Sequence, residues 1–279
     1  MNNFIKRTLF GIIYVAVLIG GIVWSPSTFC ILFAIITGLA VNEFDNIVEE
    51  HGLAQPNKMI NMVSAVYLFL TVFLYTNRNF SCVIFMPYLF SLLYIMIGEL
   101  FQQKRNPVAN WAYSFAGQIY IAVPFTLLNF IANTPENGYT YFLPLSIFIF
   151  IWLNDTGAYL FGSLLHNAIP YKLSPRISPH KTWIGSIGGG IVVILSAVTI
   201  SYLTQIATIW LWIGLGLVVT VFATLGDLTE SQIKRHVGIK DSGKFLPGHG
   251  GVLDRFDSAL FAIPATVIYI YCTNFYQLT

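Results

Sequence analysis

The chain has 279 residues, of which 56% are hydrophobic and only 9% are charged, a composition that excludes an ordinary soluble domain. Its formal net charge of +2 indicates no particular partner, because the positions of the charges matter more than their sum. Apolar runs of roughly 20 residues with almost no charge are typical of membrane-spanning helices. We therefore expect an all-α, polytopic membrane protein.

The apolar runs predict about nine transmembrane helices. The first follows Lys6 and Arg7 and has no small-x-small cleavage site after it, so we interpret it as an uncleaved span. It is separated from the second only by residues 25–27, which predicts a tight hairpin. In chain order, the predicted spans are Leu9–Trp24, Thr28–Phe44, Met59–Tyr75, Phe80–Leu100, Trp111–Ile131, Tyr141–Leu165, Trp183–Leu203, Ile206–Leu225 and Ala259–Tyr276.

The basic residues predict the orientation, since Lys and Arg gather on the cytoplasmic side of a membrane. With the N-terminus in the cytoplasm, this topology places all 14 Lys and Arg residues except Arg78 on the cytoplasmic side. We expect residues 1–140 to form an N-terminal part with five spans, serving as scaffold, dimer contact or lipid-facing surface. Residues 141–279 would form the catalytic region, with cytoplasmic loops 166–183 and 226–258.

The acidic stretch after the second span and the three cysteines are interpreted without a chemical role. An acidic stretch, Glu43–Lys58, is interpreted as a solvated extension of a helix, with Glu43, Asp45, Glu49 and Glu50 facing water. The three cysteines have no metal-ligand spacing and are interpreted as packing residues.

The segment 227–258 contains ten of the chain's 14 basic and 12 acidic residues, although it lies between two apolar runs. This mixture of carboxylates, bases and glycines favours a metal ion and phosphates as partners. The basic residues are Lys234, Arg235, Lys240, Lys244 and Arg255, and the acidic ones are Asp227, Glu230, Asp241, Asp254 and Asp257.

Two of these carboxylates border the membrane. Asp227 directly follows one apolar run and Asp254 shortly precedes another, where a carboxylate is costly unless it is solvated, paired or bound to a cation. Asp254 and Asp257 are three residues apart and would share one face of a helix. Oxygen ligands alone suit Mg²⁺ or Mn²⁺ rather than zinc. Pairing with Arg255 or a lysine, or capping of a helix, remains an equal alternative.

Three further places are candidates for chemistry. The glycine-rich residues 247–251 would let backbone N–H groups approach a phosphate, or His249 would simply hold a turn. Ser178, Lys181 and Thr182 precede a predicted helix and could bind a phosphate at its N-terminus, or Lys181 could snorkel to the membrane surface. Asp155 lies inside an apolar run, where an ionisable residue is a functional candidate by default.

At this point the residues resemble a known family. The pattern S-x-I-K-R-x4-K-D-x-G-x2-L-P-x-H-G-G-x-x-D-R-F-D over residues 231–257 is similar to the signature of phosphatidate cytidylyltransferases, or CDP-diacylglycerol synthases. Also similar are G-D-L-x-E-S at 226–231, N-D-T-x-A-Y at 154–159 and S-P-x-K-T-W-x-G at 178–185. The chain departs from the family at Ile184, where an acidic or amide residue is common, and at His180, where a small or basic one is usual.

The resemblance implies transfer of a cytidylyl group from CTP to phosphatidate, with Mg²⁺, in a homodimer of multi-spanning subunits. It also implies that Asp227 and Asp254 hold a divalent cation beside a monovalent one such as K⁺. No nucleic acid partner is expected, and the compact length suggests a bacterial plasma-membrane protein with a cytoplasmic active site. We assign catalytic roles to Asp227, Asp254, Lys234, Arg235 and Asp257, and nucleotide or cation binding to Ser178, Lys181, Thr182, Lys240, Asp241, Lys244, His249 and Arg255.

Two other functions compete with this one. A CTP-dependent polyprenol or dolichol kinase would need a base for its alcohol substrate, such as Asp257 or His249. A cation transporter could place Asp155, Asp227 and Asp254 along an ion path. A CDP-alcohol phosphotransferase is disfavoured, because the D-G-x-x-A-R start of its motif does not occur.

Overall fold

A computed structural model of the chain describes residues 3–78, 80–134, 138–165, 171–243, 250–273 and 275. Within the described part, eight helical segments are long and apolar enough to cross a membrane by length and composition, and Thr8–Trp24 is a shorter apolar helix. The all-α, polytopic prediction is therefore confirmed. Two compact units share the chain: unit 1 comprises residues 1–144 and 241–256, and unit 2 comprises residues 145–240 and 257–279.

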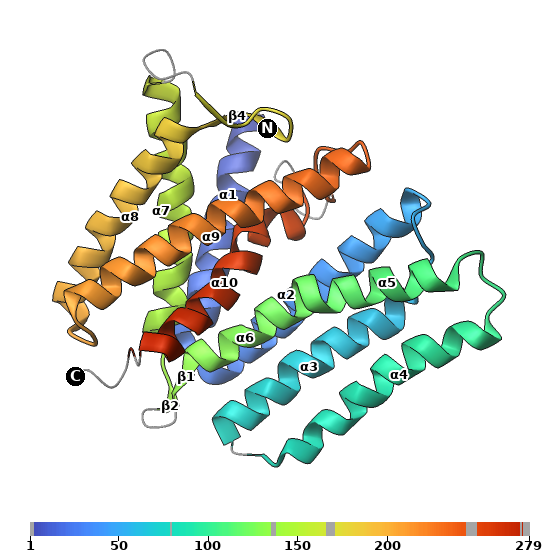
Figure 1. Ribbon diagram of the computed structural model, residues 1–279. Helices are drawn as coiled ribbons and strands as arrows, with labels where there is room; N and C mark the ends of the chain where they lie inside the picture. Colours follow the sequence, from blue (N-terminus) through green and yellow to red (C-terminus); the bar gives the residue numbers. More distant parts are fainter. Residues whose placement is uncertain are drawn as a thin grey trace. The chain divides into compact units, whose positions relative to one another are not determined.

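Helices dominate both units (Figure 1). Unit 1 contains α1 (Asn3–Trp24), α2 (Pro26–Glu50), α3 (Lys58–Arg78), η1 (Cys82–Phe85), α4 (Met86–Phe101), α5 (Pro107–Gly117), η2 (Gln118–Ala122), α6 (Val123–Ala132) and the strands β1 (Asn133–Thr134) and β2 (Gly138–Tyr139). Unit 2 contains most of α7 (Phe142–Leu165), the strands β3 (Lys172–Ser174) and β4 (Ser178–Thr182), α8 (Trp183–Thr204) and α9 (Ile209–His236). The last helix, α10 (Leu253–Thr273), begins in unit 1 and continues in unit 2.

The predicted hairpin between the first two spans is present. Pro26 begins α2, where its missing N–H costs nothing, and Ser25 caps the helix. The Ser25 hydroxyl accepts the Thr28 N–H at 3.1 Å, and the Thr28 hydroxyl accepts the Ser25 N–H at 3.0 Å. This reciprocal capping box satisfies two donors that a helix start leaves unpaired, so the turn needs only one residue between the helices.

The fifth predicted span is a helix with a break in its middle. It extends from Pro107 to Ala132 and passes through the π-helical turn η2 just before Pro124. A proline inside a helix has no N–H to donate and its ring crowds the preceding turn, and a π-turn is one way to relieve both effects. The break in the regular α-helix therefore lies just before the proline of the sequence.

Unit 1 has an aromatic core between its helices. The ring centroids of Phe29 and Phe33 on α2 are 4.9 Å apart, and Phe69 of α3 lies 6.2 Å from Phe29. Phe125 of α6 lies 6.4 Å from Phe33 and 5.4 Å from Phe256, which belongs to the first turn of α10. All five side chains are buried. This core holds the start of α10 against α6 within unit 1.

A polar network lies beside that core and corrects one prediction. Asp45 of α2 is fully buried, and its carboxylate accepts the Asn61 amide at 2.9 Å; the same amide also reaches the Ser114 hydroxyl at 3.1 Å. Glu43 is also buried, whereas Glu50 is exposed as expected. The interpretation of Glu43–Lys58 as a solvated extension is therefore wrong for its first part, because α2 continues with these carboxylates turned into unit 1.

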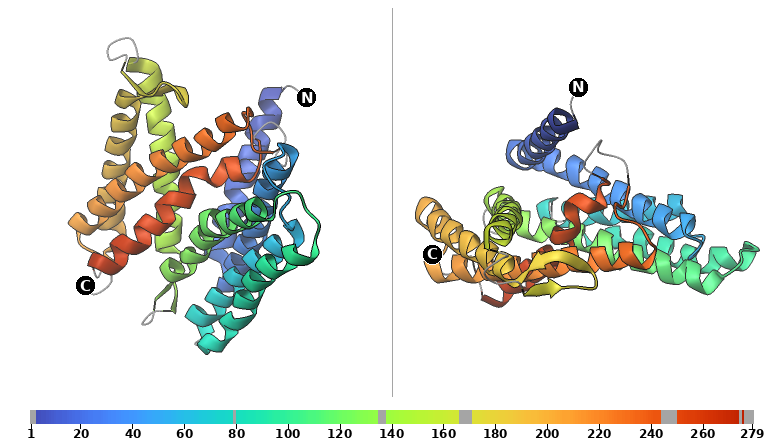
Figure 2. Two further views of the ribbon diagram at one scale, coloured as in Figure 1. Left: turned by 45° about the vertical axis from the view of Figure 1, so that its right-hand side comes forward. Right: turned by 90° about the horizontal axis from the view of Figure 1, so that it is seen from above.

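In unit 2, α7 and α8 approach closely at glycines and run side by side in both views of Figure 2. A Cβ added at Gly185 would lie 2.7 Å from the Ala158 carbonyl oxygen, and one at Gly189 would lie 2.5 Å from the Asn154 carbonyl oxygen. Small residues at such crossings are typical of helices packed within membranes. The glycines thus allow α8 to lie directly against the part of α7 that carries Asp155.

The next helix, α9, is longer than the predicted span Ile206–Leu225. Its 28 residues would extend about 42 Å at ~1.5 Å per residue, more than the ~30 Å of a hydrocarbon layer. Trp212 near its start is fully buried and packs edge-on against Phe150 and Phe275. The helix continues to His236, so the first part of the polar segment 227–258 is helical rather than loop.

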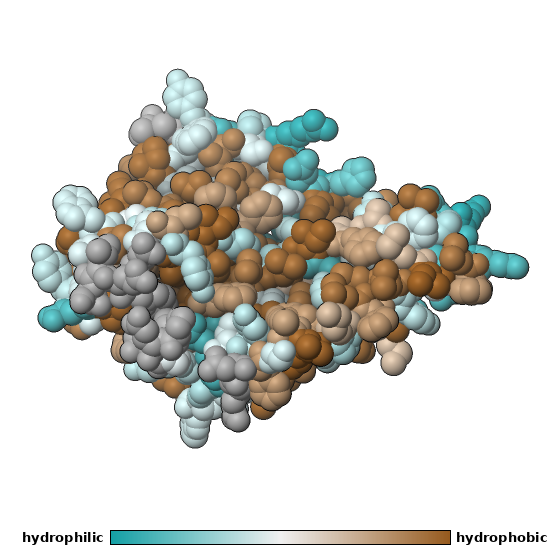
Figure 3. Space-filling model, turned by 60° about the horizontal axis from the view of Figure 1, so that its bottom comes forward, coloured by the Kyte–Doolittle hydropathy of each residue, from teal (hydrophilic) through white to brown (hydrophobic). Residues whose placement is uncertain are grey.

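The surface of the described residues is rich in apolar side chains. Figure 3 shows hydrophobic residues over much of one face, with hydrophilic residues concentrated toward its margins. On α4, the side chains of Phe90, Leu93 and Leu100 are all more than half exposed, as expected of a lipid-facing helix. All three cysteines are free, but only Cys30 is buried, so the packing interpretation is wrong for Cys82 and Cys272.

Candidate active site

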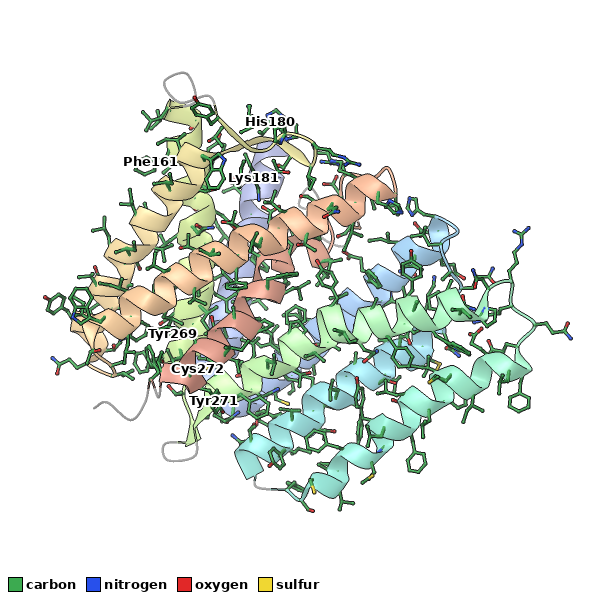
Figure 4. The ribbon with its side chains drawn as sticks, in the orientation of Figure 1. Phe161, His180, Lys181, Tyr269, Tyr271 and Cys272 are labelled. Atoms are coloured by element: carbon green, nitrogen blue, oxygen red, sulfur yellow. The ribbon has the colours of Figure 1, made fainter. Side chains whose placement is uncertain are left out.

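The predicted phosphate-binding segment forms the short hairpin of β3 and β4. The strands pair antiparallel, with Lys172 opposite Thr182 and Ser174 opposite Ser178. Thr182 ends the hairpin and caps α8, since its hydroxyl accepts the Gly185 N–H at 3.2 Å. Figure 4 shows His180 and Lys181 on β4 near the start of α8. The hairpin thus fixes Lys181 at a helix N-terminus, as the sequence predicted.

Lys181 makes an ion pair with the carboxylate of Asp227 on α9. Both side chains remain about one-quarter exposed, so the pair is partly open to solvent. The other Asp227 oxygen, Oδ1, accepts the Ser231 hydroxyl at 3.2 Å from one turn further along α9. Two segments that the sequence identified separately, 178–185 and 226–231, therefore meet through charged side chains.

Asp257 belongs to the same cluster of unit 2. A Cβ at Gly226 would lie 2.6 Å from the Asp257 carbonyl oxygen, so glycine at this position lets α9 approach the backbone of α10. The Asp257 carboxylate is close enough to Asp227, Glu230 and Asp155 for their charges to act on it. Like charges this close favour a bound cation or compensating basic residues. We call Lys181, Asp227, Glu230, Ser231 and Asp257 the Asp227 cluster.

Two predicted phosphate ligands on α9 already have protein partners. Lys234 is buried and forms an ion pair with Glu230 one turn earlier, which is itself 1% exposed. Arg235 is exposed, and its guanidinium donates to the Ile239 carbonyl oxygen at 2.8 Å beyond the end of the helix. Lys234 therefore balances a buried carboxylate, and a direct phosphate contact would require it to leave Glu230.

Asp254 lies in the first turn of α10 and is held by backbone groups of unit 1. Its Oδ2 atom accepts the N–H of Ser242 at 2.8 Å and the N–H of Gly251 at 2.8 Å. Gly250 has φ +86°, and a Cβ there would overlap the same oxygen. A left-handed glycine next to the carboxylate thus lets the chain fold tightly around it. Asp254 and Asp257 are both in α10, as their spacing predicted.

Glu43 was predicted to face water, but it is buried and hydrogen-bonded in unit 1. Its carboxylate accepts the N–H of Val252 at 2.8 Å, the N–H of Leu253 at 3.0 Å and the hydroxyl of Ser242. The signal that could have revealed it was its place within the predicted span Thr28–Phe44, since an ionisable residue in an apolar helix indicates a function or a partner. We call Glu43, Ser242, Gly251 and Asp254 the Asp254 cluster.

The remaining predicted site residues are placed as follows. Lys240, Asp241 and Arg255 are exposed, and Ser178 is half-buried on β4. Lys244 and His249 lie outside the described residues. Within the described part of the chain, no three His, Cys, Asp or Glu side chains are grouped so that they could hold a metal ion. Asp227 and Asp254 belong to different units, so their joint role as ligands stays a prediction.

Comparisons with known proteins agree with the signature. The sequence profile of the cytidylyltransferase family matches residues 5–273. A phosphatidate cytidylyltransferase of Staphylococcus aureus (strain COL) is 36% identical over 205 residues, covering 73% of this chain and 76% of that protein. The protein of the same name from Staphylococcus haemolyticus is 35% identical over 216 residues, covering 67% of this chain and 80% of its own length.

Proposed function

Since the chain belongs to the cytidylyltransferase family, we propose that it transfers the cytidylyl group of CTP to phosphatidate, releasing pyrophosphate and leaving CDP-diacylglycerol. It is a multi-pass membrane nucleotidyltransferase. The names of the two staphylococcal relatives give phosphatidate as their substrate. A lipid acceptor also suits a chain whose charged residues gather beside apolar helices, because the head group and the acyl chains can each meet a matching surface.

The observation that carries this proposal is the ion pair between Lys181 and Asp227. It brings the segment 178–185 to the segment 226–231, so two of the segments that resemble the family form one polar cluster in unit 2. A lysine at a helix N-terminus can bind a phosphate, and a carboxylate beside it can bind a cation. Binding of a nucleoside triphosphate with its cation needs both kinds of group.

The reaction itself asks little proton chemistry of the protein. The phosphomonoester of phosphatidate has a second pKa of about 6, so near pH 7 its oxygen is mostly ionised and ready to attack. A bond forms between that oxygen and the α-phosphorus of CTP, and the bond from the α-phosphorus to the β-phosphate oxygen breaks. Pyrophosphate leaves with the electron pair. The difficulty is the repulsion between two anionic groups, which basic side chains can reduce.

We assign Lys181 to orient the phosphates of CTP by leaving Asp227 as the nucleotide arrives, together with Ser178 and Thr182. Thr182 would contribute its backbone, because its hydroxyl already caps α8. Lys240 and Arg255 are exposed, and we assign both to the phosphates. Lys244, which lies outside the described residues, keeps the same assignment. Lys234 and Arg235 would support them after exchanging their present partners.

We also propose that Asp227 and Asp254 both contribute ligands to Mg²⁺. The residues fit a hard divalent cation, because they offer carboxylate oxygens and because Asp257 adds a further carboxyl group beside Asp227. When bound, Mg²⁺ supplies positive charge that offsets the repulsion between the phosphates and stabilises the departing pyrophosphate. A second, monovalent cation such as K⁺ remains part of the proposal.

The cellular location and the orientation in the membrane are also part of the proposal. We propose a bacterial plasma-membrane protein whose active site faces the cytoplasm, because the basic residues favour that orientation and the matched relatives are bacterial. We expect the enzyme to be a homodimer. Cross-linking of the purified protein in detergent checks this, and a chain that stays monomeric at all concentrations would contradict it.

The test uses the full-length protein purified in detergent with phosphatidate and CTP labelled at the α-phosphate or the γ-phosphate. We expect the α-label in the lipid product and the γ-label in pyrophosphate. A lipid carrying the γ-label would instead indicate a CTP-dependent lipid kinase. Cation flux in vesicles without CTP, and no labelled lipid, would indicate a transporter.

A further inference from the structure

We propose that Glu43 is a positioning residue of this enzyme: its buried carboxylate ties α2 to the segment before α10 and thereby fixes the orientation of the Asp254 carboxylate. This inference rests on the proposed function, which gives Asp254 its place in the active site. Glu43 belongs to none of the segments that resemble the family, and its partner Ser242 lies 199 positions further along the chain.

Glu43 binds the start of α10 and Ser242. Its side chain is buried, and its two oxygens accept three hydrogen bonds, from Ser242 Oγ, Val252 N and Leu253 N. Val252 and Leu253 are at the start of α10, where N–H groups have no partner within the helix and carry partial positive charge. A carboxylate is therefore a favourable acceptor here, and it comes from a different helix.

Ser242 links Glu43 to Asp254. The Ser242 hydroxyl donates to Glu43 and accepts the Asp254 N–H at 3.3 Å, while the Ser242 N–H donates to Asp254 Oδ2 at 2.8 Å. One serine thus joins both carboxylates. Moving Glu43 would release the Ser242 hydroxyl and, with it, one of the two backbone donors that orient Asp254.

Two glycines lie close against the Glu43 carboxylate. A Cβ at Gly243 would lie 2.8 Å from Glu43 Oε2, and one at Gly251 would overlap the Glu43 carboxylate. The backbone on both sides of residues 244–249 therefore approaches this side chain as closely as glycine permits. Of the glycine-rich residues 247–251 that we expected to approach a phosphate, Gly250 lies against the Asp254 carboxylate and Gly251 against the Glu43 carboxylate.

A merely structural role is the competing explanation, because a buried carboxylate that caps a helix also stabilises the fold. The two roles differ in what a neutral replacement changes. In Glu43→Gln, the amide NH₂ must face at least one of the N–H donors, so part of the network breaks while the side-chain volume is kept. Partners that orient a metal ligand typically change metal affinity or activity by about 10- to 100-fold when they are removed.

The experiment measures Mn²⁺ binding to the full-length enzyme in detergent, without substrates, by the loss of the free Mn²⁺ signal in electron paramagnetic resonance. Thermal unfolding, kcat and the KM for CTP are measured on the same samples. For Glu43→Gln we expect Mn²⁺ affinity and kcat to fall by about 10- to 100-fold in protein that is still folded. The KM for CTP should change far less, because no nucleotide contact is removed.

The matched control is Glu50→Gln, which makes the same chemical change on the same helix at an exposed position. It should match the wild type in every measurement. Ser242→Ala is the second variant and should lower Mn²⁺ affinity in the same direction. The double variant should lose little more than the worse single variant, because both changes break one connection.

The inference is overturned if folded Glu43→Gln keeps the wild-type Mn²⁺ affinity and kcat and shows only a lower unfolding temperature. If Glu43→Gln does not fold, the same measurements on Ser242→Ala decide the question. Asp254→Asn separates this failure from that of the proposed function. Unchanged Mn²⁺ binding and turnover in Asp254→Asn would remove Asp254 from the active site, whatever Glu43 does.

Discussion

The two aspartates that we propose as metal ligands have contrasting hydrogen-bond partners. In unit 2, Asp227 is held by side chains: the Lys181 ammonium on one oxygen and the Ser231 hydroxyl on the other. In unit 1, Asp254 is held by the backbone, with the N–H groups of Ser242 and Gly251 both directed at Oδ2. Asp227 lies among charged side chains, and the backbone of Gly250 and Gly251 lies against the Asp254 carboxylate.

The contrast indicates a division of labour. A lysine can change rotamer within nanoseconds, so the partner of Asp227 can leave when a nucleotide arrives. A backbone N–H can move only if the turn before α10 moves, and Glu43 holds that turn. We therefore expect Asp254 to be pre-organised and Asp227 to be the adaptable member. A pre-organised group is already in place, so no free energy is spent on reorienting it during the reaction.

The largest effect is expected for the pre-organised member. Asp254→Asn removes the charge and points an amide NH₂ or oxygen at two donors that are fixed by the backbone. We expect kcat to fall by at least about 10³-fold at every Mg²⁺ concentration, which corresponds to about 4 kcal/mol. Initial rates of labelled lipid formation over a Mg²⁺ titration check this. Activity that recovers at high Mg²⁺ would mean that Asp254 only tunes affinity.

Asp227→Asn sharpens the same comparison. It should also lower kcat strongly, but it should leave Lys181 with a neutral partner and free its ammonium for CTP. We therefore expect CTP binding in the absence of catalysis to be retained or strengthened, as measured by equilibrium dialysis with labelled CTP. Weaker CTP binding than in the wild type would contradict the idea that Lys181 alternates between Asp227 and a phosphate.

An intermediate effect is expected for Lys181 itself. Lys181→Met keeps the length of the side chain and removes the charge, so kcat/KM for CTP should fall by about 100-fold, the scale of one lost charged contact to phosphate. Lys181→Arg keeps the charge and should retain more activity than Lys181→Met. Equal activity in the two variants would show that the charge at this position does not act on the nucleotide.

Much of the fold was predictable because the physics of the membrane is simple. The apolar runs identified the spanning helices, and Ser25 with Pro26 identified the first turn. The extent of α9 was not predictable, because the helix continues through Asp227 into a segment whose composition resembles a loop. Only its interactions explain this: Glu230 and Lys234, one turn apart, neutralise each other inside unit 2.

The candidate site was predictable where spacing within one segment carries the information. The place of Lys181 and Thr182 just before a helix and the shared helix of Asp254 and Asp257 followed from local sequence. Glu43 did not, because its role depends on Ser242 and α10, and no local pattern shows a contact across 199 positions. The close approach of Gly226 to Asp257 was likewise hidden, since it depends on how α9 packs against α10.

A smaller effect is expected at that crossing. In Gly226→Ala the added methyl group would meet the Asp257 carbonyl oxygen, so α9 and α10 must separate. Overpacking of this kind costs about 1–3 kcal/mol, and we expect a lower thermal midpoint together with reduced activity. Gly20→Ala is the control, since a Cβ there has no neighbour within 4 Å and alanine favours the helix. Equal midpoints for the two variants would contradict the close packing at Gly226.

The smallest effect is expected for Ser231→Ala, which removes one neutral donor from the adaptable member. The hydroxyl lies 3.2 Å from Asp227 Oδ1, and a single hydrogen bond of this kind contributes about 0.5–1.5 kcal/mol. We therefore expect kcat to fall by no more than about 10-fold. Ser242→Ala, the corresponding loss at Asp254, should cost more, because that serine also holds Glu43 in place. If the two serine variants lose activity equally, the backbone-held aspartate is no more pre-organised than its partner, and the contrast between them has no functional meaning.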